Sequence, residues 1–366
     1  MERVIKKPLV IGLGKVGYLV ALLLKETGFK VTGCDLQPDR THEFPTKSVD
    51  VTDLEQTHAL LAEHDCVISC LPYNFNAPLA QIAAERQLHY FDLTEDVETT
   101  NKIIEISKTS KKVMAPQCGL APGFIAIVGA TLASRFEKIR SIKLRVGALP
   151  KHPTGLLGYA FNWSPEGVVN EYLNDCEVIE HGTRKMVSPL EWLETLVIDG
   201  VQLEAFTTSG GLGTMCETYA GVVENLDYKS IRYPGHAALM NFYLHELLMR
   251  EDRELAGKIL VHAKPPVNED VVYMHASAEG WINGNLQREE FVRTYEPVDV
   301  AGRPRRTIAW TTAASVCSVV ELVAEGRLPN SGFIKQEEIG LEDFLATANG
   351  RLFAGQVHGG INVRSA

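Results

Sequence analysis

The chain has 366 residues, which is too long for one small domain, so we expect two domains. Its formal net charge of −10 has no compensating basic patch and argues against a nucleic-acid partner. Seven scattered cysteines, without C-x-x-C pairs or Cys/His clusters at metal spacing, predict no metal site and favour a reducing, cytoplasmic location.

The N-terminus does not indicate a targeting segment. A few basic residues precede a short apolar run, but this run leads directly into a glycine loop, unlike a signal peptide. We find no apolar stretch of about 18 residues and therefore expect no membrane span.

The first predicted unit is a strand, a glycine loop, a helix and a second strand. A strand over 8–12 leads into Gly12-Leu13-Gly14-Lys15-Val16-Gly17, a helix follows over 18–27, and a strand over 29–34 ends at Asp35. Gly12 permits the turn, Gly14 lets a pyrophosphate approach the backbone, and Gly17 lets the helix pack close to the strand. This context favours dinucleotide binding over a glycine turn in some other α/β protein.

The residue after the second strand bears on which dinucleotide is bound. Asp35 would accept hydrogen bonds from the adenosine ribose diol, and its charge would repel a 2′-phosphate, which favours NAD. Arg40 is a basic side chain just past this acid, so NADP stays possible.

Alternating strands and helices continue to about residue 118 and predict an α/β domain with a Rossmann-type, doubly wound parallel sheet. The carboxyl ends of the strands in such a sheet face the ligand. We therefore expect Cys70, Leu71 and Pro72 beneath the nicotinamide ribose, and Asp50 and Val51 beside the adenine.

The pattern changes at Gly119–Gly123, where we place a domain boundary. Strands predominate from residue 138, with a helix predicted over 236–249, which suits a largely antiparallel sheet with few helices. A helix that starts after Thr311 is expected to return to the first domain. The predicted division is 1–118, 119–310, 311–349 and a loose tail over 350–366.

Several motifs resemble the saccharopine dehydrogenase-like family, and within it the lysine 6-dehydrogenase branch. The generic glycine loop is joined by two more specific segments, Tyr159-Ala160-Phe161-Asn162-Trp163-Ser164-Pro165-Glu166 and Ile231-Arg232-Tyr233-Pro234-Gly235-His236. The resemblance implies a Rossmann domain paired with a mixed α/β (α+β) substrate domain, often in a homodimer. It also implies NAD(P)-dependent oxidation of the C–N bond of a lysine-like amino acid, or the reverse condensation of an amine with an aldehyde.

The segment Thr208–Thr214 departs from this resemblance. It is glycine-rich where lysine 6-dehydrogenases carry an acid and an arginine. If those polar groups contact the substrate, their absence favours a larger or different amine adduct over lysine.

Hydride removal from an amine carbon needs a nearby base, because the neutral amine is the form that releases the hydride. Asp92, at the end of a predicted strand, and His236 are the candidates, although Asp92 could instead cap the next helix and His236 could simply pack. Arg232 is the candidate partner of a substrate carboxylate, with a surface ion pair as the alternative. Further candidate substrate contacts are Gly119, Tyr159, Asn162, Trp163 and Glu166.

Three functions therefore remain open. The first is an NAD(P)-dependent amine dehydrogenase acting on a lysine-like amino acid. The second is the same chemistry run toward synthesis, as in saccharopine or carboxyspermidine formation. The third is a protein that binds a dinucleotide without turnover.

Overall fold

The computed structural model describes residues 3–39 and 41–355, and the chain divides into two compact units. Of the described residues, the first unit comprises those up to Ile127 and Ala309–Phe353, and the second comprises Val128–Ile308. The first unit thus extends past the expected boundary at residue 118. Most of the expected loose tail, residues 356–366, lies outside the described residues, but residues 351–354 form a short helix.

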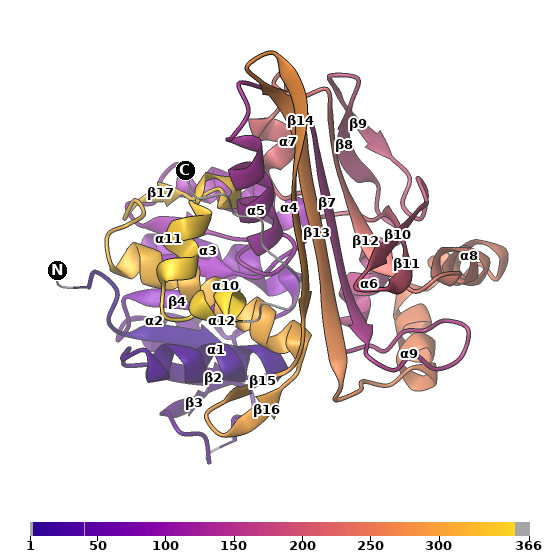
Figure 1. Cartoon of the computed structure of the whole chain (residues 1–366). Helices are drawn as coiled ribbons and strands as arrows, with labels where there is room; N and C mark the ends of the chain where they lie inside the picture. Colours follow the sequence, from indigo (N-terminus) through magenta and orange to yellow (C-terminus); the bar gives the residue numbers. More distant parts are fainter. Residues whose placement is uncertain (1–2, 40, 356–366) are drawn as a thin grey trace. The chain divides into compact units, whose positions relative to one another are not determined.

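The first unit is built on a seven-stranded parallel sheet with the strand order β17-β6-β5-β4-β1-β2-β3 (Figure 1). All residues of β1, β4 and β5 are buried, as expected where helices cover both faces of a parallel sheet. The strands are β1 (Pro8–Ile11), β2 (Thr32–Asp35), β3 (Thr46–Ser48), β4 (Cys66–Ser69), β5 (His89–Asp92), β6 (Val113–Ala115) and β17 (Gly332–Phe333).

Side-chain caps define the starts of two helices in this unit. Asp53 accepts a hydrogen bond from the backbone of Gln56 at the start of α2, and Asp96 accepts one from Thr99 at the start of α4. The N-cap of α4 is therefore Asp96, so the alternative role considered for Asp92 does not apply. The helices between the strands are α1 (Lys15–Glu26), α2 (Leu54–Leu61), η1 (Tyr73–Phe75), α3 (Asn76–Glu85), α4 (Val97–Ser107) and α5 (Phe124–Ala133).

The C-terminal segment returns to the first unit, as the sequence predicts. Within α10 (Thr307–Ala324), the Ser315 hydroxyl donates a hydrogen bond to the Gly119 carbonyl (2.8 Å), and β17 then pairs with β6. By length and hydropathy α10 could cross a membrane, contrary to our expectation that no such stretch occurs, but 89% of it is buried inside the structure, as in a core helix. The segment ends with η4 (Gln336–Glu338), α11 (Leu341–Ala346) and α12 (Arg351–Ala354).

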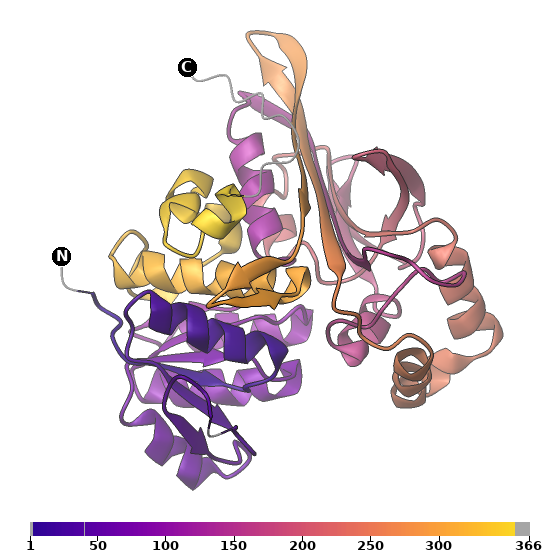
Figure 2. The ribbon, with the colours of Figure 1, turned by 60° about the horizontal axis from the view of Figure 1, so that its bottom comes forward.

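The second unit is built on an eight-stranded mixed sheet with the order β10-β11-β12-β7-β13-β14, to which β8 and β9 are added beside β12. Among the described strand pairs of this sheet only β7–β12 is parallel, and β13, which forms a long hairpin with β14, pairs antiparallel with β7 (Figure 2). The strands are β7 (Lys138–Pro150), β8 (Cys176–Glu180), β9 (Thr183–Val187), β10 (Glu194–Ile198), β11 (Val201–Thr207), β12 (Asn225–Arg232), β13 (Asp270–Ile282) and β14 (Asn285–Tyr295), followed by the small pair β15 (Val298–Val300) and β16 (Arg303–Arg305).

The helix predicted over 236–249 is interrupted, which corrects the sequence prediction. α8 (His236–Asn241) passes into a π-helical turn, η2 (Phe242–Glu246), and Leu248 then adopts a left-handed backbone with φ of 57°. Hydrophobic periodicity does not register a change of this kind, because the apolar spacing continues through it. The other helices of this unit are α6 (Pro165–Glu171), α7 (Met215–Thr218), η3 (Met249–Glu251) and α9 (Arg253–Ala263).

Candidate functional site

The glycine loop between β1 and α1 fits a dinucleotide pyrophosphate. Gly12 has φ of 90°, a backbone conformation that favours glycine, and a Cβ at Gly17 would collide with the Gly12 carbonyl. A Cβ at Gly14 would meet nothing within 4 Å, so the backbone here is open to a ligand. No side chain caps the N-terminus of α1, which leaves its first N–H groups and partial positive charge for a phosphate.

Asp35 lies beside this loop at the carboxyl end of β2. Its Oδ2 accepts a hydrogen bond from the Leu13 backbone N–H (2.8 Å), and its Oδ1 accepts a longer one from Gln37 (3.2 Å). The carboxylate is half-buried and retains lone pairs for further donors. This position fits an acceptor for the ribose diol, whereas Arg40 lies outside the described residues.

The expected adenine neighbours follow β3. Asp50 is exposed, and its Oδ1 accepts hydrogen bonds from the backbone N–H and the hydroxyl of Thr52 (2.9 and 2.7 Å). These hydrogen bonds hold the pKa of the Asp50 carboxyl below its usual value. Val51 is half-buried against the core beneath it. Adenine contact by these two residues stays a prediction.

The residues after β4 that are expected beneath the nicotinamide ribose lie next to the glycine loop. The Cys70 N–H donates to the Ile11 carbonyl (2.8 Å), and a Cβ at Gly12 would touch Leu71, so these residues border the turn directly. Pro72 is exposed. This neighbourhood is consistent with the predicted contact to the dinucleotide.

Asp92 is fully buried at the carboxyl end of β5. Its Oδ1 accepts from the backbone of Thr94 and Gln117 (both 3.0 Å), and its Oδ2 accepts from the Tyr90 hydroxyl (3.0 Å). Burial raises the pKa of Asp92 to about 6 although these hydrogen bonds oppose the shift. Three donors tie this carboxylate to the backbone after β5 and β6, which supports a positioning role; its catalytic role stays a prediction.

Glu95, three residues further on, is half-buried and is suited to proton transfer by its pKa. Burial, with smaller contributions from Asp96 and Asp92, raises its pKa to about 7. A general base is most effective when its pKa lies near the working pH. Glu95 follows the carboxyl end of β5, and this position together with its pKa makes it a second candidate base.

Gly119 lies in the loop between β6 and α5. Its carbonyl accepts the Ser315 hydroxyl and the Phe124 backbone N–H (2.8 and 2.9 Å), so α10 and α5 both fix this loop. A Cβ at Gly123 would collide with the Gly119 carbonyl. The tight loop is thus explained by packing in the first unit, and substrate contact by Gly119 stays a prediction.

Arg232 anchors the candidate site of the second unit. It is the last residue of β12, only 3% exposed, and its guanidinium donates from Nε to the Tyr172 hydroxyl and from Nη1 to the Ile231 carbonyl (both 2.8 Å). Its Cζ lies 4.9 Å from the ring centroid of Tyr159 and 5.7 Å from that of Tyr172. A surface ion pair, the alternative considered from the sequence, is therefore wrong.

The guanidinium has unused donors. It carries five N–H groups, and the hydrogen bonds to Tyr172 and Ile231 account for two of them. Among the residues that the structure describes, no carboxylate forms an ion pair with it. The buried carboxylate of Glu171 lies near enough to help raise the pKa of Arg232, but it forms no ion pair with the guanidinium, so the unused donors still fit an anionic ligand such as a carboxylate.

His236 is also buried, at the first position of α8. Its Nδ1 lies 3.0 Å from the Leu157 carbonyl and its Nε2 lies 3.0 Å from the Tyr172 hydroxyl. Burial, together with the charge of Arg232, lowers the pKa of His236 to about 3. Both ring nitrogens are engaged, which supports an orienting role; catalysis by His236 stays a prediction.

The specific segment 159–166 divides into two groups. Tyr159 and Trp163 belong to the aromatic surroundings of Arg232, since the Trp163 indole donates to the Tyr159 hydroxyl (3.1 Å). Asn162 instead accepts from the Val267 backbone (2.9 Å), and Glu166 is exposed and accepts from the Ser164 hydroxyl (3.1 Å). The structure thus brings Tyr159 and Trp163, but not Asn162 or Glu166, into the group around Arg232 and His236.

Two residues of this group were not singled out from the sequence as site residues. Tyr172 bridges Arg232 and His236, and Glu204 accepts hydrogen bonds from the backbone of Gly235 and Ala237 (both 2.7 Å). Glu204 lies opposite Arg232 in the β11–β12 register. Glu204 belongs to the segment Leu203-Glu204-Ala205-Phe206, which also resembles the family, whereas no such segment contains Tyr172.

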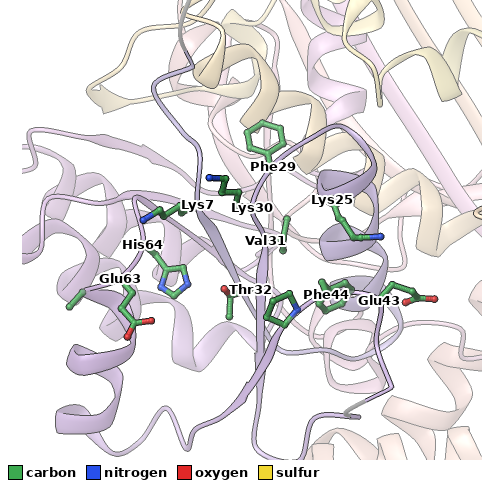
Figure 3. A pocket seen from close by; sticks show the side chains of 12 residues that line it. Lys7, Lys25, Phe29, Lys30, Val31, Thr32, Glu43, Phe44, Glu63 and His64 are labelled. Carbon is green, nitrogen blue, oxygen red and sulfur yellow. The ribbon is translucent and has the colours of Figure 1, made fainter.

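A separate groove of about 670 Å³ lies at the amino-terminal edge of the parallel sheet (Figure 3). Thr32 at the start of β2 and the lysines Lys7, Lys25 and Lys30 line it. Lys25 is in the last turn of α1, and lysines near a helix C-terminus offset its partial negative charge. The glycine loop lies at the opposite ends of these strands, so the groove is not part of the dinucleotide site.

The cysteines contribute no reactive centre. All seven are free thiols, and burial raises the pKa of Cys34 to about 11 and that of Cys70 to about 12. Within residues 3–39 and 41–355, no group of three or more His, Cys, Asp or Glu residues is placed to hold a metal ion.

Comparisons with solved structures show the same fold. Apo saccharopine dehydrogenase (L-Glu forming) from Saccharomyces cerevisiae matches with a TM-score of 0.72 at 16% identity, over 95% of this chain and 96% of that one. C. glutamicum DAP dehydrogenase in complex with DAP matches with a TM-score of 0.52 at 11% identity, over 96% and 99% of the two chains. At these identities the likeness concerns the fold alone.

Curated relatives are similar over part of their length. The saccharopine dehydrogenase [NADP(+), L-glutamate-forming] of Pyricularia oryzae is 26% identical over 204 residues, which is 52% of this chain and 45% of that protein. The Saccharomyces cerevisiae protein of the same name is 28% identical over 162 residues, which is 40% and 34%. The chain therefore spans less than half the length of the curated relatives it matches.

Family models account for nearly the whole chain. Residues 9–116 match the saccharopine dehydrogenase NADP binding domain, so the first unit is a nicotinamide-dinucleotide-binding domain. Residues 119–352 match the saccharopine dehydrogenase C-terminal domain, and the chain thus belongs to the saccharopine dehydrogenase family.

Proposed function

We propose that the chain is an NAD(P)-dependent oxidoreductase that acts on the C–N bond of a lysine-like amino acid. The observation that carries this proposal is Arg232, a buried guanidinium with unused donors that forms no ion pair with a carboxylate of the described chain. It supplies the docking point that an amino-acid carboxylate needs. The glycine loop and Asp35 supply the features that a dinucleotide needs.

The chemistry requires few groups from the protein. A bound nicotinamide dinucleotide supplies the hydride acceptor. The substrate ammonium first loses a proton, for which Glu95 and Asp92 are the candidate bases because burial raises both pKa values toward neutrality. The nitrogen lone pair then forms the C=N bond as the hydride leaves the carbon, and water adds to the imine to release an aldehyde and the amine.

A second candidate is the reverse reaction, the reductive condensation of an amine with an aldehyde. The names of the curated relatives favour a saccharopine-type adduct, and the glycine-rich segment Thr208–Thr214 agrees with a substrate bulkier than lysine. Lysine 6-dehydrogenation stays a prediction on the sequence resemblance. So do a homodimer and a cytoplasmic location.

The nature of the dinucleotide is proposed separately. The half-buried carboxylate of Asp35 beside the glycine loop favours the NAD ribose diol over a 2′-phosphate. The family description and the relatives' names instead favour NADP. We propose that NAD binds more tightly and that NADP is accepted.

The test is a set of fluorescence assays on the full chain. If oxidation is favoured, the chain should produce reduced cofactor from NAD or NADP when L-lysine, L-saccharopine or another amino acid is added. If synthesis is favoured, it should consume NADH or NADPH only when an amine and an aldehyde are both present. Arg232→Ala should raise KM for carboxylated substrates and leave cofactor affinity unchanged. Cofactor binding with no turnover in either panel would refute the proposal in favour of a non-catalytic dinucleotide-binding protein.

A further inference from the structure

We propose that Tyr172 and His236 are positioning residues that hold the Arg232 guanidinium in the orientation that binds a substrate carboxylate. The inference deepens the proposed function and rests on its assignment of Arg232. It assigns no proton transfer to His236.

Arg232, Tyr172, His236 and Leu157 form a chain of hydrogen bonds, and the residues at its two ends determine which atom donates in each bond. The Leu157 carbonyl can only accept, so the proton of the His236 ring is on Nδ1 and Nε2 is an acceptor. The Tyr172 hydroxyl therefore donates to Nε2, and its oxygen accepts from Arg232, which can only donate. The chain runs from Arg232 through Tyr172 and His236 to Leu157 in one direction.

This polarity leaves His236 no free lone pair. Nδ1 carries the proton and Nε2 accepts from Tyr172, so a substrate ammonium could transfer a proton to His236 only by displacing Tyr172. Such a displacement would leave two buried polar groups unpaired, which is unfavourable. The low pKa of His236, about 3, keeps the imidazole neutral and available as the acceptor.

The backbone that carries His236 is itself fixed. Gly235 has φ of 94°, and its N–H and that of Ala237 both donate to the buried carboxylate of Glu204 (2.7 Å each). Glu204 thereby holds the turn into α8 from the neighbouring strand β11. The imidazole faces the Phe206 ring at 6.1 Å between centroids with an interplanar angle of 14°, which further limits its rotation.

These contacts leave the guanidinium little freedom. Nε is held by Tyr172 and Nη1 by Ile231, and two tyrosine rings flank the group. The remaining N–H donors of Arg232 are presented in a fixed plane, which suits the two oxygens of a carboxylate. Pre-organisation of this kind improves affinity because less side-chain freedom is lost on binding.

The first experiment separates this inference from the proposed function by using glutarate, a dicarboxylate without a reacting amine, as a binding probe in calorimetry. Tyr172→Phe should weaken glutarate binding by about 5–50-fold, since it removes the hydrogen bond that orients Nε. Arg232→Ala should weaken it at least as much. Tyr243→Phe is the matched control, because the Tyr243 hydroxyl donates to the Ala256 carbonyl (2.9 Å) and forms no hydrogen bond with Arg232, Tyr172 or His236, and this variant should bind glutarate as the unaltered chain does.

The outcomes are distinct. Loss in Arg232→Ala with unaltered affinity in Tyr172→Phe would overturn the positioning role and leave the carboxylate assignment intact. Unaltered affinity in Arg232→Ala, or no glutarate binding by the unaltered chain, would overturn both. Weakened binding in both variants, without turnover of any amino acid by the unaltered chain, would support the inference and refute the proposed enzymatic function. Unfolding midpoints in urea, measured on each variant, show whether a loss of affinity reflects a loss of fold.

The second experiment distinguishes positioning from general base catalysis at His236. His236→Asn removes the imidazole but retains an oxygen that can accept from Tyr172. If His236 only positions Arg232, KM for L-saccharopine should rise, because the guanidinium is held less well, and kcat should fall by less than tenfold, because no base is lost. A fall in kcat of about 10²–10⁴-fold at unchanged KM, with loss of the acidic limb of the pH–rate profile, is the signature of a removed base and would overturn the inference.

Discussion

Replacing Asp35 is the sharpest test of how this chain selects its dinucleotide. Asp35→Ser should weaken NAD binding and strengthen NADP binding. The carboxylate already accepts from the Leu13 N–H (2.8 Å) and would accept from the ribose diol through charge-assisted hydrogen bonds. Such bonds contribute about 1.5–3 kcal/mol, so NAD affinity should fall by roughly 10–100-fold.

The gain for NADP comes from removed repulsion. A dianionic 2′-phosphate about 5 Å from a carboxylate is repelled by about 1–2 kcal/mol at the dielectric constant of water, so NADP affinity should rise by about 5–30-fold. The ratio of the two dissociation constants should therefore shift by roughly 10²–10³-fold. Salt at about 0.5 M should reduce the NADP part of this shift and leave the NAD part nearly unchanged.

Asp35→Asn is the matched control, because it keeps an acceptor oxygen for Leu13 and removes the charge. It should reproduce the gain for NADP and only part of the loss for NAD. Both dissociation constants can be measured by quenching of intrinsic fluorescence or by calorimetry on the full chain. A ratio that stays within threefold in both variants would mean that Asp35 does not meet the ribose.

Two further predictions concern the first unit. Gly14→Ala should leave the urea midpoint unchanged and weaken dinucleotide binding about tenfold or more, because the added Cβ meets open space where the pyrophosphate approaches. Gly17→Ala should lower the free energy of unfolding by about 1–3 kcal/mol, because its Cβ collides with the Gly12 carbonyl. Equal effects of the two substitutions on stability would contradict this prediction. The pKa of Asp92 is raised from 3.8 to about 6, so the folded state binds the proton more tightly than the unfolded state does. The contribution of Asp92 to the free energy of unfolding is therefore largest below about pH 4, and about 3 kcal/mol of it is lost as the pH rises through 6. Asp92→Asn should flatten that part of the slope in urea titrations from pH 4 to 7, while the parallel contribution of Glu95 remains; an unchanged slope would show that Asp92 does not titrate there.

The dinucleotide half of the site was predictable because local sequence determines it. The loop over 12–17 and the acid at Asp35 lie within one strand–helix–strand unit, and the structure brings them into hydrogen-bonding contact through Leu13. Short-range motifs of this kind need no knowledge of distant parts of the chain. The same holds for the specific segments that contain Tyr159, Trp163 and His236.

The rest of the second site depends on strand pairing that the sequence did not reveal. The sequence pattern does not predict β12, which ends at Arg232, because its residues are buried on both faces and include Asp227 and Lys229, so neither alternation nor a continuous apolar run appears. Glu204 reaches α8 only because β11 pairs with β12 in the register Glu204–Arg232. Tyr172 follows α6 and carries no motif, so nothing local marks it.

The return of the C-terminal segment has a consequence for biosynthesis. Until residues 309–333 leave the ribosome, β6 has no neighbour on its outer side, since β17 supplies the pairing partners of Val113 and Met114. A nascent chain that ends before this point exposes a bare strand edge and the apolar surface that α10 covers, which invites association between chains. The first domain to be started is thus the last to be finished, and premature termination anywhere in the second unit should yield insoluble product.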